Sequence, residues 1–69
     1  MLMNYDIRKN RDGVEMQKAG SEIVERFPSH EAARQALVRR HNQPIGLIYS
    51  DAGAEDDHTW WFYCFEAEG

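Results

Sequence analysis

The chain has little cysteine and no long apolar run, and each shortage removes a class of protein. Its 69 residues include one cysteine, Cys64, so no disulfide can form within the chain, although small secreted domains usually rely on several. No apolar stretch approaches the ~18 residues that a membrane-spanning helix needs. The first ten residues turn polar too soon for a secretory signal. We therefore expect a soluble, cytoplasmic protein without membrane contact that forms a single compact domain over residues 1–69.

The sequence also lacks the residue spacings that carry chemistry. His30, His41, His58 and Cys64 stand at none of the separations typical of zinc ligands, and the acidic segment that begins at Asp51 does not follow the calcium-loop pattern. There is no nucleophile elbow and no phosphate-cradling glycine loop. We therefore expect no enzyme activity, no cofactor and no metal.

Positive charge is missing from the second part of the chain. Residues 1–43 hold all eight Lys and Arg and six of the twelve acidic residues, whereas residues 44–69 hold the other six acids. The net charge of −4 thus combines a slightly basic part with a strongly acidic one. Such asymmetry usually serves solubility, and it can also mark a surface for a basic partner.

Residue patterns in the first part of the chain predict strands. Apolar and polar residues alternate over residues 3–7 and again over residues 14–17, which is the period of a half-buried strand. Asp12-Gly13 lies between them and predicts a two-residue type I′ turn, whose central residues need positive φ. Residues 22–27 are interpreted as a third strand, with a helix as the alternative, and Pro28 ends that segment.

Residues 29–42 carry the one clear helix pattern. Ser29 suits the N-cap, Glu31 lies in the first turn, and basic residues fill the last turn, as the helix dipole favours. Ala33 and Leu37 share a face that we expect to lie against a sheet. Strands at 44–50 and 59–67 follow. The sequence therefore predicts an α+β fold in the order β-β-β-α-β-β, an antiparallel sheet of about five strands with one α-helix on one face.

The strongest feature is an unbroken aromatic run near the end, TWWFYCFEA. Alternation along a strand divides the run between two faces of the sheet. One face takes Thr59, Trp61, Tyr63 and Phe65, and the other takes Trp60, Phe62, Cys64 and Glu66. A single helix of about a dozen residues is roughly 18 Å long and covers one face only. We therefore expect one tryptophan to serve the core and the other a contact with another chain. The alternative is a central strand whose second face is covered by loops and long polar side chains of the same chain.

These features predict a protein-binding module without catalysis of its own. Aromatic residues concentrate in the cores of interfaces, and an acidic loop can attract a basic groove. The predicted partner-binding residues are Trp60, Trp61, Tyr63 and Phe65 with the acidic residues Asp51, Glu55, Asp56 and Asp57. The partner is expected to be a protein, with a homodimer among the candidates. Small acidic proteins of this kind are common among phage and mobile-element accessory proteins that inhibit host machinery, such as the anti-CRISPR inhibitors.

The alternative is a small nucleic-acid-binding or regulatory domain that acts through its basic first hairpin. The residues of that alternative are Arg8, Lys9, Arg11 and Lys18. The stretch FPSHEAARQAL locally resembles the strand-to-helix junction of the arm-type DNA-binding domains of phage recombinases. Acidic residues in the same strands would repel phosphates, and the overall charge is negative, so binding to protein is favoured over nucleic acid.

Overall fold

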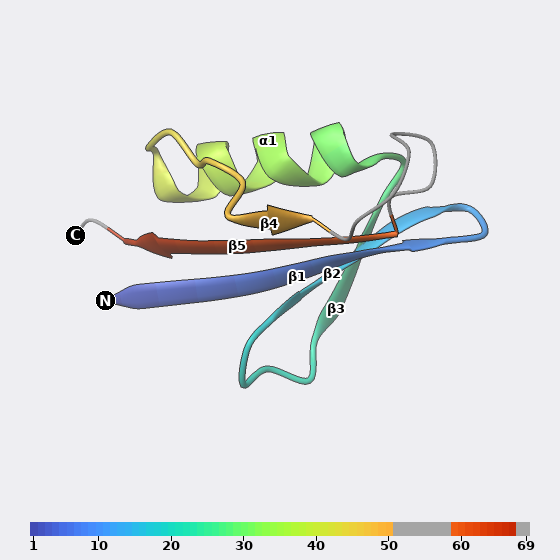
Figure 1. Cartoon of the computed structure of the whole chain (residues 1–69), viewed down its shortest axis with the longest axis horizontal. Coiled ribbons are helices and arrows are strands. Elements are labelled where there is room, and N and C mark those ends of the chain that lie inside the picture. The colour runs from blue at the N-terminus through green and yellow to red at the C-terminus, as the bar shows by residue number, and fades with distance from the viewer. Residues whose placement is uncertain (51–58, 68–69) are drawn as a thin grey trace.

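The structure, a computed structural model, describes residues 1–50 and 59–67. These residues form five strands and one helix, namely β1 (Leu2–Asn10), β2 (Gly13–Lys18), β3 (Val24–Phe27), α1 (His30–His41), β4 (Tyr49–Ser50) and β5 (Trp60–Glu66). The strands form one sheet in the order β3-β2-β1-β5-β4, and every neighbouring pair is antiparallel. Helix α1 lies along one side of this sheet (Figure 1). The predicted α+β fold and its element order are confirmed.

The core lies between α1 and the face of the sheet that is turned toward it. Strand β1 is the central strand, and its alternate residues on this face are buried, as the period of two requires. The buried residues are Met3, Tyr5, Ile7, Val14, Met16, Ala33, Leu37, Ile45 and Tyr63. A core of this size in a chain of 69 residues leaves a small stability margin.

Helix α1 begins and ends where its capping residues predict. The side chain of Ser29 accepts a hydrogen bond from the Ala32 N–H at 3.2 Å, and Asn42 adopts the left-handed conformation that ends many helices. Ala33 and Leu37 are the buried residues of the helix, as the sequence predicted. These caps fix the length of α1, and the small alanine lets it lie close to the sheet.

The first hairpin is confirmed, but its predicted turn is wrong by one residue. Asn10 pairs with Gly13, so the two loop residues are Arg11 and Asp12 instead of Asp12 and Gly13. Among the residues that the structure describes, Asn42 is the only non-glycine residue with positive φ, so the turn is not of type I′. Gly13 is needed for another reason: it has a φ of 152°, and a Cβ there would lie 2.3 Å from the carbonyl oxygen of Phe27 in β3.

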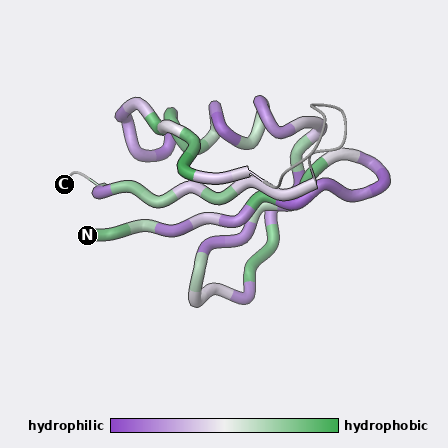
Figure 2. The backbone as a smooth tube through the Cα atoms, in the orientation of Figure 1, coloured by the Kyte–Doolittle hydropathy of each residue, from purple (hydrophilic) through white to green (hydrophobic). Residues whose placement is uncertain are grey.

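The edge strands differ from each other in how well the sequence predicted them. Residues 22–27 do contain a strand, β3, and the alternative of a helix is wrong. Strand β4 is much shorter than the predicted 44–50, because Pro44 cannot donate a hydrogen bond and pairing with β5 starts only where the Ile48 N–H meets the Phe62 carbonyl at 3.2 Å. The hydrophobic segment just before β4 is visible in Figure 2. Of its large side chains, Ile45 is buried and Leu47 is exposed.

Candidate protein-binding surface

The surface of interest is the sheet face turned away from α1, which we call the open face. The strand register arranges its side chains in rows across the sheet. One row is Tyr49, Phe62, Asp6, Gln17 and Val24, a second is Trp60, Arg8, Glu15 and Arg26, and a third pairs Cys64 with Asn4. Within residues 1–50 and 59–67, no helix packs on this face. The described helix therefore covers one side of the sheet and leaves the other side without a helix.

Aromatic side chains gather on the part of the open face formed by β4 and β5. We call Tyr49, Trp60, Phe62 and Cys64 the aromatic half. The distance between ring centroids is 5.0 Å for Trp60 and Tyr49 and 6.4 Å for Trp60 and Phe62, so the three rings form a continuous cluster. Tyr49 is 49% exposed, and the other three residues are half-buried. This cluster is a partly exposed aromatic patch beside the edge strand β4.

A hydrogen bond fixes the orientation of Trp60 within this patch. The indole Nε1–H of Trp60 donates to Oδ1 of Asp6 on the neighbouring strand β1 at 3.0 Å. The polar atom of the indole is therefore satisfied within the chain. Rigid aromatic side chains of this kind give much contact area for little loss of conformational entropy.

The rest of the open face is polar and its charges balance. Arg8, Glu15 and Arg26 lie side by side on three adjacent strands, with 3.4 Å between Arg26 Nε and Glu15 Oε1. Asp6 supplies a second carboxylate beside them, so the two arginines face two acids. A shallow hollow of about 100 Å³ lies between these side chains, with Val24 at its edge. This part of the face has no net charge that would favour a polyanion.

Asn4 is the least satisfied polar group of the open face. Its Oδ1 is buried and has no hydrogen-bond partner among the described residues. The side chain lies opposite Cys64, next to the aromatic half. An unpaired buried oxygen costs about 1–3 kcal/mol.

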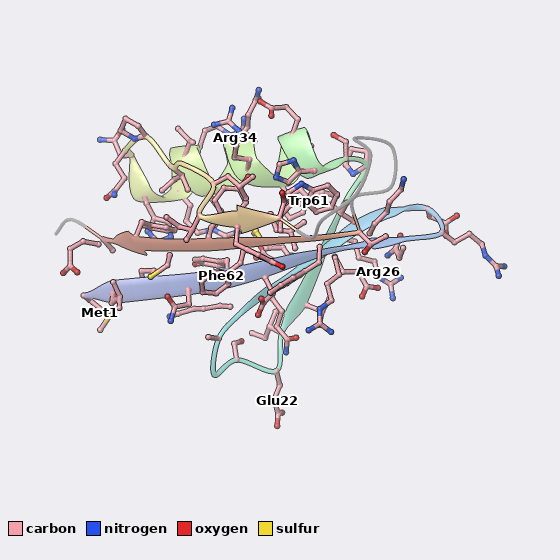
Figure 3. All side chains as sticks on the ribbon, viewed as in Figure 1. Met1, Glu22, Arg26, Arg34, Trp61 and Phe62 are labelled. Atoms are coloured by element: carbon pink, nitrogen blue, oxygen red, sulfur yellow. The ribbon has the colours of Figure 1, made fainter. Side chains whose placement is uncertain are left out.

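The other half of the aromatic run belongs to the core side. Figure 3 shows Trp61 on the α1 side of β5 and Phe62 on the opposite side. The Trp61 ring stacks on His30 of α1 at a centroid distance of 4.3 Å, and Phe65 stacks on Tyr5 at 6.0 Å. Both side chains are half-buried and pack against the core. Trp61 and Phe65 therefore lie on the face that α1 covers, and their assignment to partner binding stays a prediction.

Tyr63 lies deepest of the aromatic residues. Its side chain has 0% exposure, and its hydroxyl makes a hydrogen bond of 2.5 Å with Nε2 of His30. Burial raises the pKa of Tyr63 to about 12, a rise that nearby Arg34 reduces and Glu31 increases. Tyr63 therefore presents no exposed surface in the single chain, and its assignment to partner binding stays a prediction.

A second histidine and tyrosine pair joins the other end of α1 to the sheet. The hydroxyl of Tyr5 and Nε2 of His41 lie 3.2 Å apart. Burial lowers the pKa of His41, and the positive charges of Arg40 and Lys18 lower it further. Arg40 also binds Glu25 of β3, with 2.5 Å between the nearest nitrogen and oxygen. Together with His30 and Tyr63, these contacts hold both ends of the helix on the core side.

The predicted acidic and basic site residues differ in whether the structure describes them. The acidic residues Asp51, Glu55, Asp56 and Asp57 lie outside the described residues. Arg8 lies on the open face, Lys9 and Arg11 are exposed near the first turn, and Lys18 lies at the far end of β2. The four basic residues therefore form no single patch.

Sequence reasoning left three residues of the aromatic half out of its predicted site. Phe62 and Cys64 carried a usable signal, because alternation along β5 placed both on the same face as Trp60. Tyr49 carried none, since its place beside Phe62 depends on how the segment after α1 returns to the sheet.

Elsewhere on the molecule, a hollow of about 550 Å³ runs along α1. Two arginines border it, with an apolar floor and polar side chains at its end. Its lining residues are Arg34, Val38, Arg39, Asn42, Gln43, Pro44 and Ile45. Arg34 is already paired with Glu31 at 2.6 Å, and this pairing, with help from Gln35, lowers the pKa of Glu31 to about 2.

The three comparisons with known proteins found no match. No protein-family model matches the chain, and neither a curated protein nor a solved structure matches it. The described residues contain no group of three or more His, Cys, Asp or Glu side chains placed to hold a metal ion. Among the same residues, no helix could cross a membrane.

Proposed function

We propose that the protein is a small binding module whose open face contacts another protein. The observation that carries this proposal is the aromatic half, in which Trp60, Phe62 and Tyr49 form a cluster on a sheet face that no described helix covers. Contiguous apolar patches of this kind are uncommon on monomeric proteins and common at interfaces. A module that occupies a partner's surface without chemistry would act as an inhibitor or an adaptor.

The balanced charges of the open face favour protein over nucleic acid as the partner. Binding to a phosphate backbone depends on clustered Lys and Arg, whereas Arg8 and Arg26 lie beside Glu15 here. Exposed aromatic rings also stack on nucleic-acid bases, so nucleic acid is the competing outcome of the experiment.

The experiment compares two matched variants in capture from the native host. The open-face variant carries Phe62→Ser with Tyr49→Ser, and the control carries Gln35→Ser with Arg39→Ser on the outer side of α1. Wild type and control should retain the same protein, and the open-face variant should lose it, while circular dichroism shows all three folded. Equal retention by all three, or retention of nucleic acid alone, contradicts the proposal. A captured protein must then bind in purified form with the same dependence on the open face.

A further inference from the structure

We propose that the partner seated on the open face is a second copy of this chain, related by a twofold axis that passes near Phe62. This inference rests on the proposed function and identifies the protein that binds the open face as the chain itself. The result is a dimer in which two sheets face each other and a helix covers each outer side. Face-to-face packing of twisted sheets about 10 Å apart is a common way to bury two apolar faces.

The position of Phe62 suits a twofold axis. It lies between Tyr49 on β4 and Asp6 on β1, and Trp60 and Cys64 flank it along β5 on the same face. Phe62 is therefore the centre of the aromatic half, and the centre of an interface is where the strongest contacts concentrate. A twofold axis at this point uses the same patch twice, so one surface is sufficient for both partners.

The charges of the open face also fit a second copy. Arg8 and Arg26 balance Asp6 and Glu15 across adjacent strands, so two copies of this face do not repel each other. A strongly basic or strongly acidic partner would find no matching excess of charge here. Glu66, at the end of β5, is paired with the amino group of Met1 at 2.5 Å and adds no unbalanced charge.

The size of the face is sufficient for a dimer. The molecule measures 35 Å along its longest axis and 20 Å along its shortest. The longest strand, β1, has nine residues and spans about 30 Å at ~3.3 Å per residue, and five strands about 4.8 Å apart span roughly 19 Å. A face of these dimensions is comparable with the ~800 Å² that each partner gives to a standard interface. A second copy would also supply the layer that the sheet lacks on this side, which matters for a chain with so small a core.

The test uses opposite charges at the proposed axis. Two variants of the full chain, Phe62→Lys and Phe62→Glu, are studied alone and mixed, with the mass measured by sedimentation equilibrium. Wild type should be a dimer, and each variant alone should associate at least about tenfold more weakly, because like charges meet at the axis. The equimolar mixture should recover a dimer, since the two charges are then opposite. Gln35→Lys and Gln35→Glu are the controls, and neither should change the mass.

The reactivity of Cys64 provides an independent measure of dimerisation in the wild-type chain. It is the only cysteine, and it lies on the open face in a half-buried position. Its rate of alkylation by iodoacetamide should fall several-fold when the protein concentration is raised through the dimerisation range. In the monomeric Phe62→Lys variant, the rate should not depend on concentration.

Three results overturn the dimer: a wild type that stays monomeric at high concentration, a dimer that Phe62→Lys leaves unchanged, and a charge mixture that stays monomeric. The proposed function survives the first of these if the capture experiment still depends on the open face. Failure of both experiments removes the open face as a binding surface. Should Phe62→Lys or Phe62→Glu unfold, the same pair of charges at Tyr49, which is 49% exposed, repeats the test.

Discussion

Tyr63 shows why one half of the aromatic run belongs to the core. Its ring packs in the core, and its buried hydroxyl would be unsatisfied without the hydrogen bond that it shares with His30. The same histidine stacks on Trp61, so one residue of α1 organises two aromatic side chains of β5. The aromatic density of this side of β5 is thus explained by the attachment of the helix, and the proposed binding concerns the other side.

The first prediction concerns alkaline pH. An unfolded tyrosine loses its proton near pH 10, whereas burial keeps Tyr63 protonated until about pH 12 in the folded state. The folded state therefore binds more protons between these values, and the free energy of unfolding should fall as pH rises from 10 to 12. Tyrosinate absorbance followed together with circular dichroism measures this. Tyr63 should ionise only above pH 10, together with the loss of folded structure.

The control for this prediction is Tyr49→Phe, which removes an exposed hydroxyl and should leave the alkaline transition in place. Tyr63→Phe should lower stability at neutral pH but remove its own part of the loss above pH 10. Ionisation of all three tyrosines near pH 10 in a chain that remains folded would show that Tyr63 is accessible to water.

At the scale of elements, the sequence predicted what local chemistry decides. Helix α1 carries its own signals, with Ser29 at one end and Asn42 at the other, and the structure places both caps there. The division of β5 into two faces follows from backbone geometry alone and is also confirmed. The predicted position of the first turn was wrong. Gly13 is required because it lies close to β3, and a contact between two strands leaves no signal in the local sequence.

The site was harder to predict than the fold for the same reason. Which face of β5 meets α1 depends on the side to which the chain crosses after β3, and alternation cannot tell the two sides apart. Three of the four aromatic residues assigned to binding therefore lie on the core side. Tyr49 was missed because its role depends on the return of the chain to the edge of the sheet after the helix.

The second prediction belongs to helix α1. Leu37 has 0% exposure and is the largest buried side chain of the helix, so Leu37→Ala should lower the free energy of unfolding by about 2–5 kcal/mol. Arg39→Ala, at an exposed position of the same helix, should change it by less than about 0.5 kcal/mol. Chemical denaturation measures both. Equal midpoints for the two variants would mean that α1 packs through another face.

At the scale of the whole molecule, the sheet has one side that packs against α1 and another that no described helix covers, and the second is the side proposed to bind a partner. Helix α1 and its two histidine–tyrosine pairs cover one side, whereas on the other side a hydrogen bond joins Trp60 to Asp6. The proposed binding by the open face predicts that a substitution at each of the two adjacent tryptophans of β5 affects a different measurement.

The last prediction compares these two tryptophans. Trp61→Ala should lower the free energy of unfolding by about 3 kcal/mol, the lower end for a buried tryptophan, because its half-buried ring packs on the core and on His30. Trp60→Ala should cost only about 1 kcal/mol, since it loses a hydrogen bond to Asp6 and packing at the surface. Its main effect should be on association, which Trp61→Ala should leave intact in the folded fraction. Denaturation and sedimentation of both variants decide the matter: a Trp60→Ala variant that associates like wild type, or one that unfolds as readily as Trp61→Ala, would contradict this division between the two faces.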